Sequence, residues 1–200
     1  MDNRKLINTA KNIDIIAKFV DGFMFAFAIV FVIFAVLVLL LGEKMFAPGS
    51  ITLDIDFIKL YLADNYQVVT DALKLYVIMA LVIGSIICLA IHYALKYLRN
   101  ILSPMKEGRP FEKDVPVNLK KIAWIILISG ALMEIIAVIE RLILTKAYPL
   151  EEVFSSVAVS KIEYTFTMDF NFIITFCIIM FLSYIFEYGI KLQIEADETL

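Results

Sequence analysis

Four long runs of apolar residues constrain this chain more than any other feature. The run from Phe23 to Leu41 contains 19 residues without a charge, and the run from Leu75 to Leu95 contains 21. Because a helix rises ~1.5 Å per residue, either run can cross the ~30 Å hydrocarbon core of a bilayer. Two further runs, Ile122 to Ile139 and Phe170 to Phe186, complete the set. The chain is therefore expected to be an all-α membrane protein, a bundle of four transmembrane helices.

The composition agrees with this expectation. Hydrophobic residues make up 62% of the chain and charged residues 20%, against about 45–50% and about 25% in soluble domains. In 200 residues, four spans leave no room for a separate soluble domain, so we expect a single integral membrane domain. Its predicted parts are an inner amphipathic helix at 1–18, spans at 19–42, 73–98, 121–144 and 169–189, outer loops at 43–72 and 145–168, an inner loop at 99–120, and an inner tail at 190–200.

The positive charges predict the orientation of the spans. Lys and Arg residues are retained on the cytoplasmic side when they lie in short segments close to a span. Of the 18 such residues, twelve lie in the N-terminal segment, the inner loop and the tail, and six lie in the two outer loops. Both termini are therefore expected to face the cytoplasm, with the chain in a plasma membrane.

Both outer loops contain a strand pattern. Apolar and polar residues alternate from Ile51 to Phe57 and again from Lys161 to Asp169, with an upstream extension through Val157 and Val159, which is the period of a half-buried strand. We expect these short strands to form a small extracytoplasmic β cap. The segment from Phe57 to Val69 carries an apolar stripe at helical spacing, which predicts a short helix. Such a cap either shields the bundle or binds a ligand or peptide.

The N-terminal segment is the predicted amphipathic helix. Apolar residues recur at helical spacing between residues 3 and 18, among four positive charges. Such a helix is typical of a segment that lies on an anionic inner leaflet. It either anchors the chain or offers a docking surface to a cytoplasmic partner. The first apolar run is longer than the core of a cleaved signal, so it is expected to remain as an anchor.

Polar residues inside the spans are the first candidates for function. A carboxyl group within a span is costly and tends to face the bundle interior, which singles out Glu134. Arg141 lies two turns further along the same face, and we expect a partner on a neighbouring helix, from among His92, Ser183 and Tyr184. Glu134 then either fixes helix packing, couples to protons or ions, or binds a ligand. Gly130 and Ser129 are small residues that allow two helices to approach closely.

The sequence contains no pattern that predicts a metal site, a cofactor site or a catalytic site. His92 follows Cys88 by four residues, but nothing else in the chain supplies a second such pair, so no metal site is predicted. Cys88 and Cys177 both lie in apolar runs, where a buried thiol is the ordinary interpretation. We find no nucleophile elbow, phosphate loop or paired acid and base. The expectation is a protein that is not an enzyme and needs no cofactor.

The inner loop and the tail carry a resemblance to a known family. Gly108-Arg109-Pro110-Phe111, then Asn118 to Ala123, and the ending from Phe186 to Leu200 are similar to the corresponding segments of the family called domain of unknown function 2975. The resemblance implies a small bacterial membrane protein with four spans, without an assigned activity, paired with a helix-turn-helix regulator. The residues expected to contact such a partner are Arg109, Phe111, Lys120, Gln193, Glu195 and Asp197.

The preferred hypothesis is a sensory or regulatory membrane module that signals to a cytoplasmic partner, such as a transcription regulator, without itself contacting nucleic acid. Two alternatives stay open. One is a small transporter or an immunity-type protein that protects the membrane, and the other is a subunit of a larger membrane complex. The lipid bilayer is the first expected partner, and the sequence leaves a homo-oligomer open.

Overall fold

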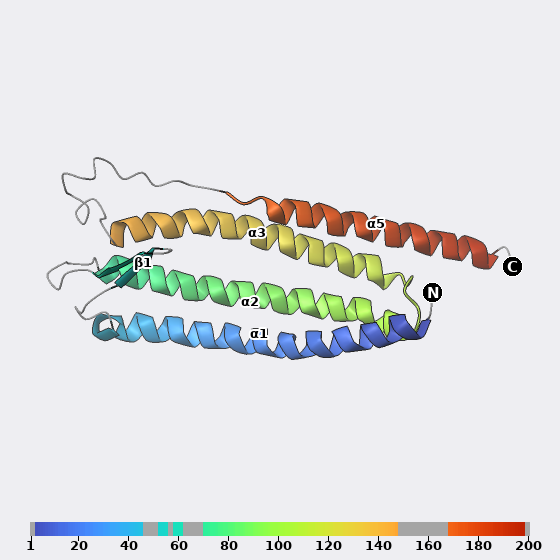
Figure 1. Cartoon of the computed structure of the whole chain (residues 1–200), viewed down its shortest axis with the longest axis horizontal. Coiled ribbons are helices and arrows are strands. Elements are labelled where there is room, and N and C mark those ends of the chain that lie inside the picture. Colours follow the sequence, from blue (N-terminus) through green and yellow to red (C-terminus); the bar gives the residue numbers. More distant parts are fainter. Residues whose placement is uncertain (1–2, 46–51, 56–57, 62–69, 148–167, 199–200) are drawn as a thin grey trace. The chain divides into compact units, whose positions relative to one another are not determined.

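Four long helices dominate the described part of the chain. The computed structural model describes residues 3–45, 52–55, 58–61, 70–147 and 168–198. The helices there are α1 (Asn3–Met45), α2 (Thr70–Lys106), α3 (Asp114–Ala147) and α5 (Asn171–Glu198) (Figure 1). Each is long enough and apolar enough to cross a membrane. The prediction of four apolar helices of membrane-spanning length is confirmed.

The helices extend beyond the spans predicted for them. α1 has 43 residues, about 64 Å at ~1.5 Å per residue, and runs without a break through the predicted amphipathic segment and the first span. α2 ends at Lys106 and α3 begins at Asp114, so the inner connection between them is only residues 107–113 rather than all of 99–120. α5 likewise includes the predicted inner tail up to Glu198. The charged segments at this end therefore belong to the helices.

A short hairpin lies between α1 and α2 in the sequence. Strands β1 (Thr52–Ile55) and β2 (Ile58–Tyr61) are antiparallel, with Thr52 opposite Tyr61 and Ile55 opposite Ile58. The first predicted strand is thus confirmed, whereas the helix predicted from residue 57 onward is wrong for β2. Ile-Lys-Leu-Tyr alternates and is rich in strand-forming side chains, so pairing with β1 prevails over the helical spacing. The strand predicted at 157–169 lies outside the described residues except for Met168 and Asp169, which are not in a strand.

The chain divides into two compact units. The first contains Met1–Val30, Gly84–Ile135 and Thr167–Leu200, and the second contains Phe31–Ile83 and Ile136–Phe166. In the second unit, the described buried residues are Ala35, Val38 and Ile83. In the first unit the buried set is rich in small side chains, as the following list shows: Ala10, Ala17, Ala28, Ser85, Cys88, Ala123 and Ser183. Small residues allow helix backbones to approach closely, which is how transmembrane helices pack.

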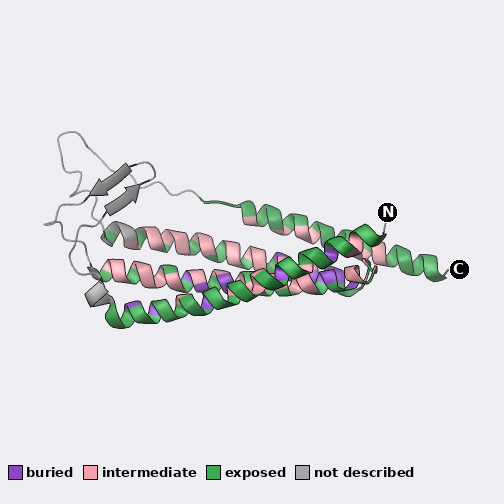
Figure 2. Cartoon of the chain, turned by 60° about the horizontal axis from the view of Figure 1, so that its bottom comes forward, coloured by how far each residue is buried: buried purple, intermediate pink, exposed green. Residues whose placement is uncertain are grey.

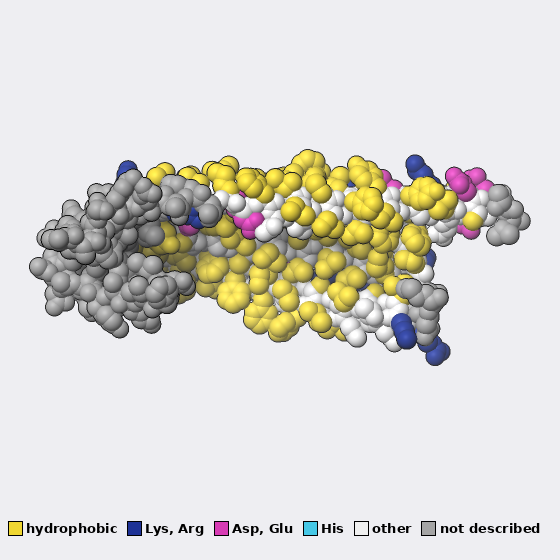
Figure 3. Space-filling view, turned by 45° about the horizontal axis from the view of Figure 1, so that its top comes forward, with side chains coloured by type: hydrophobic (Ala, Val, Ile, Leu, Met, Phe, Trp, Pro, Cys, Tyr) yellow, Lys and Arg dark blue, Asp and Glu magenta, His cyan; other side chains and the backbone are white. Residues whose placement is uncertain are grey.

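Large apolar side chains cover the outside of the helices. Phe19, Leu40 and Phe181 are 68%, 72% and 64% exposed, and Figure 3 shows hydrophobic side chains spread along the described helices. Figure 2 shows the same exposure on α1 and α5, where most of the ribbon is exposed. Exposed apolar area of this extent is unfavourable in water, but it is the normal surface of a helix in lipid.

Candidate functional site: a polar seam and an inner connection

α1 and α2 meet along a seam with heptad spacing in the first unit. On α1 the inward-facing residues follow one another at intervals of three and four: Ala10, Asp14, Ala17, Asp21, Met24 and Ala28. On α2 the same spacing gives Ser85, Cys88, His92, Leu95, Arg99, Leu102 and Lys106. Such spacing keeps one face of each helix against its neighbour. Alanines provide much of the α1 side, so the polar side chains of α2 can reach across.

The polar residues of this seam form antiparallel layers seven residues apart. Ala28 pairs with Ser85, Asp21 with His92, and Asp14 with Arg99. Seven residues are about two helical turns, or ~10 Å, so the layers form a ladder along the two helices. We call the six residues with polar side chains the polar seam: Asp14, Asp21, Ser85, His92, Arg99 and Lys106.

Distances within the polar seam show that its charges are compensated. The Ser85 hydroxyl donates to the carbonyl oxygen of Ala28 at 3.1 Å. Arg99 lies 3.2 Å from the carboxylate of Asp14 and 3.6 Å from that of Asp21. Lys106 donates to the other oxygen of Asp14 at 2.7 Å. Two carboxylates are therefore held by an arginine, a lysine and a histidine.

Asp21 and His92 form the layer nearest to the apolar runs. Nδ1 of His92 lies 2.6 Å from Oδ1 of Asp21, and both atoms are shielded from solvent. The pair has the distance of an ion pair without the angles of a regular hydrogen bond. The rings of Phe25 and Tyr93 flank the imidazole, each with a centroid 5.4 Å away.

Asp14 lies outside the charge-free stretch of α1, nine residues before Phe23. The hydrogen bond from Lys106 lowers the pKa of the Asp14 carboxyl below its ordinary value, partial burial opposes that shift, and Arg99 adds to it. A lowered folded-state pKa contributes stability above the unfolded pKa, and that contribution is lost as pH falls through the folded value. Asp14 is therefore charged at neutral pH and holds α1 against the end of α2.

A glycine ends α2 and starts the inner connection. Gly108 has φ 78°, a left-handed conformation that glycine adopts without strain. The amide of Arg109 donates to the carbonyl of Pro104 at 2.9 Å, and that of Gly108 donates to Met105 at 3.1 Å. This pair of bonds is the Schellman arrangement that satisfies the last carbonyls of a helix. The chain consequently leaves α2 in a fixed direction.

The inner connection is anchored on α5 through an aromatic ring. Phe111 packs against Phe186, with the ring centroids 5.8 Å apart. A Cβ added at Gly189 would lie 2.7 Å from that ring, so the absence of a side chain makes room for Phe111. Nearby, the buried Ser183 hydroxyl donates to the carbonyl of Pro116 at 2.9 Å. The inner connection, the start of α3 and α5 thus form one packed cluster.

A lysine joins the start of α3 to α5. Nζ of Lys120 lies 2.5 Å from a carboxylate oxygen of Glu187 and 5.1 Å from the centroid of the Tyr184 ring. Further along, Phe172 of α5 packs directly onto Gly130 of α3, which confirms the expectation that Gly130 permits a close helix approach. These contacts hold α5 beside α3 in the first unit.

The structure brings together only some of the predicted site residues. His92, Ser183 and Tyr184, the predicted partners of Glu134, bind Asp21, Pro116 and Lys120 instead. Each of them therefore has a different role from the one predicted. Glu134 itself is half-buried, and among the described residues no hydrogen bond or ion pair of Glu134 is found.

The predicted partner-contact residues separate into those that contact other residues of this chain and those that lie on the exposed end of α5. Arg109 pairs with Glu107 and Glu112 rather than with the acidic tail, and these carboxylates raise its pKa, Glu107 most. Phe111 and Lys120 bind α5 of the same chain. Gln193, Glu195 and Asp197 lie on the exposed end of α5.

Sequence reasoning missed Asp14, Asp21 and Glu187. The first two recur seven residues apart, and so do the basic residues His92, Arg99 and Lys106. That shared period of seven on two helices was the available signal. Within the described ranges, no three His, Cys, Asp or Glu side chains come together as metal ligands do.

Comparison with known proteins does not assign the chain to a class. No protein-family model, no curated protein and no solved structure matches it. The resemblance to domain of unknown function 2975 therefore stays a prediction.

Proposed function

We propose that this chain is a non-enzymatic, multi-pass protein of a bacterial plasma membrane that holds a cytoplasmic protein partner at the end of α5. Four spans place both termini on the same side of a membrane, and the distribution of Lys and Arg favours the cytoplasm for that side. With this orientation the inner connection and the charged end of the polar seam, Arg99 and Lys106, are cytoplasmic, Ser85 and His92 lie within the second span, and the hairpin β1–β2 forms part of an outer cap.

The exposed end of α5 is the observation that carries the proposal. The helix continues well past its apolar run, and all residues from Lys191 to Glu198 are exposed. Leu192 and Ile194 are 47% and 42% exposed, on a segment that the proposed orientation places in water. We call this segment, residues 191–198, the α5 tail. Large apolar side chains on an exposed helix are typical of a surface that binds another protein.

Charge indicates the kind of partner. Three acidic side chains follow the exposed apolar pair, Glu195, Asp197 and Glu198, against the single Lys191. Figure 3 shows acidic side chains gathered near the C-terminal end of α5. A complementary partner presents an apolar groove bordered by Lys and Arg. A helix-turn-helix regulator carries a basic surface, and the family resemblance implies such a regulator as the partner.

The packed cluster supplies a route for the signal. Phe111 connects the end of α2 to Gly189, two residues before the α5 tail, and the polar seam fixes the end of α2 on α1. A change in the position of α1 or α2 would therefore be passed through the inner connection to the base of the tail. The stimulus would act on the outer cap or within the spans.

Co-purification from native membranes tests the proposal. We expect one basic protein to co-purify with the full-length chain and to be lost from the variant Leu192→Asp/Ile194→Asp, and to be lost again when Glu195, Asp197 and Glu198 are changed to Lys. Asp71→Lys is the matched control because it reverses an exposed acidic residue at the start of α2. A partner that survives both tail variants, or that Asp71→Lys also removes, would contradict the proposal.

A further inference from the structure

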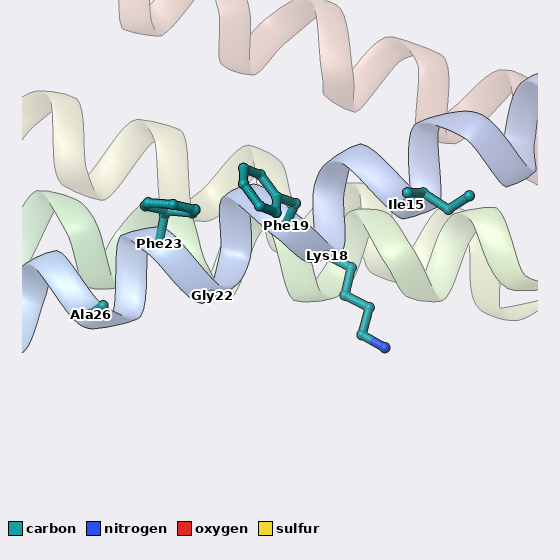
Figure 4. Close-up of a pocket in the computed structure, with 6 residues that line it drawn as sticks. All are labelled: Ile15, Lys18, Phe19, Gly22, Phe23 and Ala26. Carbon is teal, nitrogen blue, oxygen red and sulfur yellow. The ribbon is translucent and has the colours of Figure 1, made fainter.

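Apolar hollows along the helices of the first unit are candidate binding sites. One is lined by residues of α1 alone, among them Phe19, Gly22 and Phe23. Figure 4 shows that these side chains come from a single helix and that Lys18 extends away from the neighbouring helices. Since no second element lines it among the residues that the structure describes, this hollow is a helix face. The other hollow is a groove with two walls, and it is built differently.

The second groove lies between α2 and α3. Its walls are lined by Ile86, Ala90, Tyr93 and Tyr97 of α2 and by Lys121, Trp124, Ile125, Ile128, Ser129 and Leu132 of α3. The volume is about 440 Å³, within the ~300–1,000 Å³ of small-molecule sites. We call it the α2–α3 groove.

The two ends of the α2–α3 groove differ in chemistry. At one end Nζ of Lys121 lies 5.1 Å from the centroid of the Tyr97 ring, and Tyr93 and Trp124 are close along the two helices. At the other end, toward Ile86 and Leu132, the lining is aliphatic apart from Ser129, whose hydroxyl donates to the carbonyl of Ile125 at 2.7 Å. Tyr and Trp with a lysine mark the level of lipid head groups, and aliphatic residues mark the level of the acyl chains. The polarity of the groove lining therefore changes from one end to the other in the same order as that of a bilayer leaflet, from head group to acyl chain.

The length of the α2–α3 groove also matches one leaflet. Eleven residues separate Lys121 from Leu132 on α3, and eleven separate Ile86 from Tyr97 on α2. At ~1.5 Å per residue both walls are about 16 Å long, close to half of the ~30 Å hydrocarbon core. One acyl chain of a single leaflet can therefore lie along the groove while its head group stays at Lys121.

We infer that the α2–α3 groove binds an anionic phospholipid, with the lipid phosphate at Lys121 and an acyl chain between α2 and α3. The charge of the occupant follows from Lys121, whose side chain is exposed and lies against Tyr97. Lys120 next to it is already held by Glu187, so Lys121 carries the site. This inference rests on the proposed membrane location and is independent of the cytoplasmic partner.

Trp124 provides a direct assay because it is the only tryptophan of the chain and it lines the groove. The full-length protein is reconstituted in phosphatidylcholine vesicles that contain a small fraction of brominated lipid, which quenches tryptophan fluorescence on contact. Brominated phosphatidylglycerol is compared with brominated phosphatidylcholine at the same fraction. We expect the anionic lipid to be about fivefold enriched at Trp124, the equivalent of about 1 kcal/mol for one lysine at a membrane surface.

Three variants make the assay specific. Lys121→Gln should remove the enrichment, whereas Lys96→Gln, which neutralises an exposed lysine of α2 outside the groove, should preserve it. Ala90→Phe fills the apolar part and should lower the enrichment while leaving Lys121 in place. Equal quenching by the two lipids, or an enrichment that survives Lys121→Gln, would overturn the lipid site alone. If neither lipid quenched Trp124, the membrane location itself would be contradicted.

Discussion

Two glycines in apolar stretches of the helices should respond in opposite directions to the same substitution. Gly130 lies under Phe172 of α5, and a Cβ added there would be 2.3 Å from Cγ and 2.4 Å from Cβ of that phenylalanine. A Cβ added at Gly22 of α1 would meet no heavy atom within 4 Å. Gly130→Ala therefore forces two helices apart, whereas Gly22→Ala adds a methyl group in open space.

The magnitudes follow from these distances. Because Cβ of Phe172 is bonded to the backbone, it cannot yield by a change of rotamer, so the overlap at Gly130 has to be relieved by moving α5. Overpacking of this kind costs about 1–3 kcal/mol. Replacing a helical glycine by alanine without a clash instead stabilises by about 0.4–1 kcal/mol. For a chain of this size, 1 kcal/mol shifts Tm by about 2–4 °C.

Thermal unfolding in one detergent measures both variants against the wild type. Gly130→Ala should lower Tm by about 2–12 °C, and Gly22→Ala should leave it unchanged or raise it by up to about 4 °C. The pair is internally controlled, since each variant adds one methyl group to an apolar helical stretch. A Tm shift of the same sign and size in both would refute the contact between Gly130 and Phe172.

Two further predictions concern the ion pairs. Asp21→Asn removes the charge opposite His92 in a partly buried layer, so we expect a loss of about 1–3 kcal/mol of stability. The double variant Asp21→Asn/His92→Gln should recover part of this loss. An unfolding midpoint of Asp21→Asn equal to that of the wild type would show that the pair does not hold the helices together. Lys120→Glu should destabilise the contact between α3 and α5 by about 1 kcal/mol, and the charge swap Lys120→Glu/Glu187→Lys should restore it. A double-mutant cycle measures this coupling energy directly. Additive effects of the two substitutions would mean that the two side chains do not interact.

The helices could be predicted from the sequence because hydrocarbon imposes a simple rule. A run such as Phe23 to Leu41 has to be helical in a bilayer, since every backbone polar group must be satisfied within the segment. The same rule explains the role expected for Gly130. Charged residues at the helix ends obey no such rule. The extension of α2 to Lys106 was therefore not predicted from its composition.

The polar seam could not be predicted because it depends on which helices are neighbours. Asp14 looks like any charge on an amphipathic helix until α1 is placed antiparallel to α2 in the register that brings it to Arg99. His92 was recognised as unusual, but its partner Asp21 lies at the edge of an apolar run, where a charge is ordinary. β2 was missed for a related reason, since four residues of alternating pattern also fit one face of a helix.

Our central proposal is that the four helices span a membrane with the inner connection and both termini in the cytoplasm. Labelling with a membrane-impermeant thiol reagent tests it in a chain without Cys88 and Cys177. Asp71→Cys, at the start of α2, and Lys113→Cys, in the inner connection, are compared in intact and permeabilised cells. The account predicts that position 71 reacts in intact cells and that position 113 reacts only after permeabilisation. Labelling of position 113 in intact cells would contradict it.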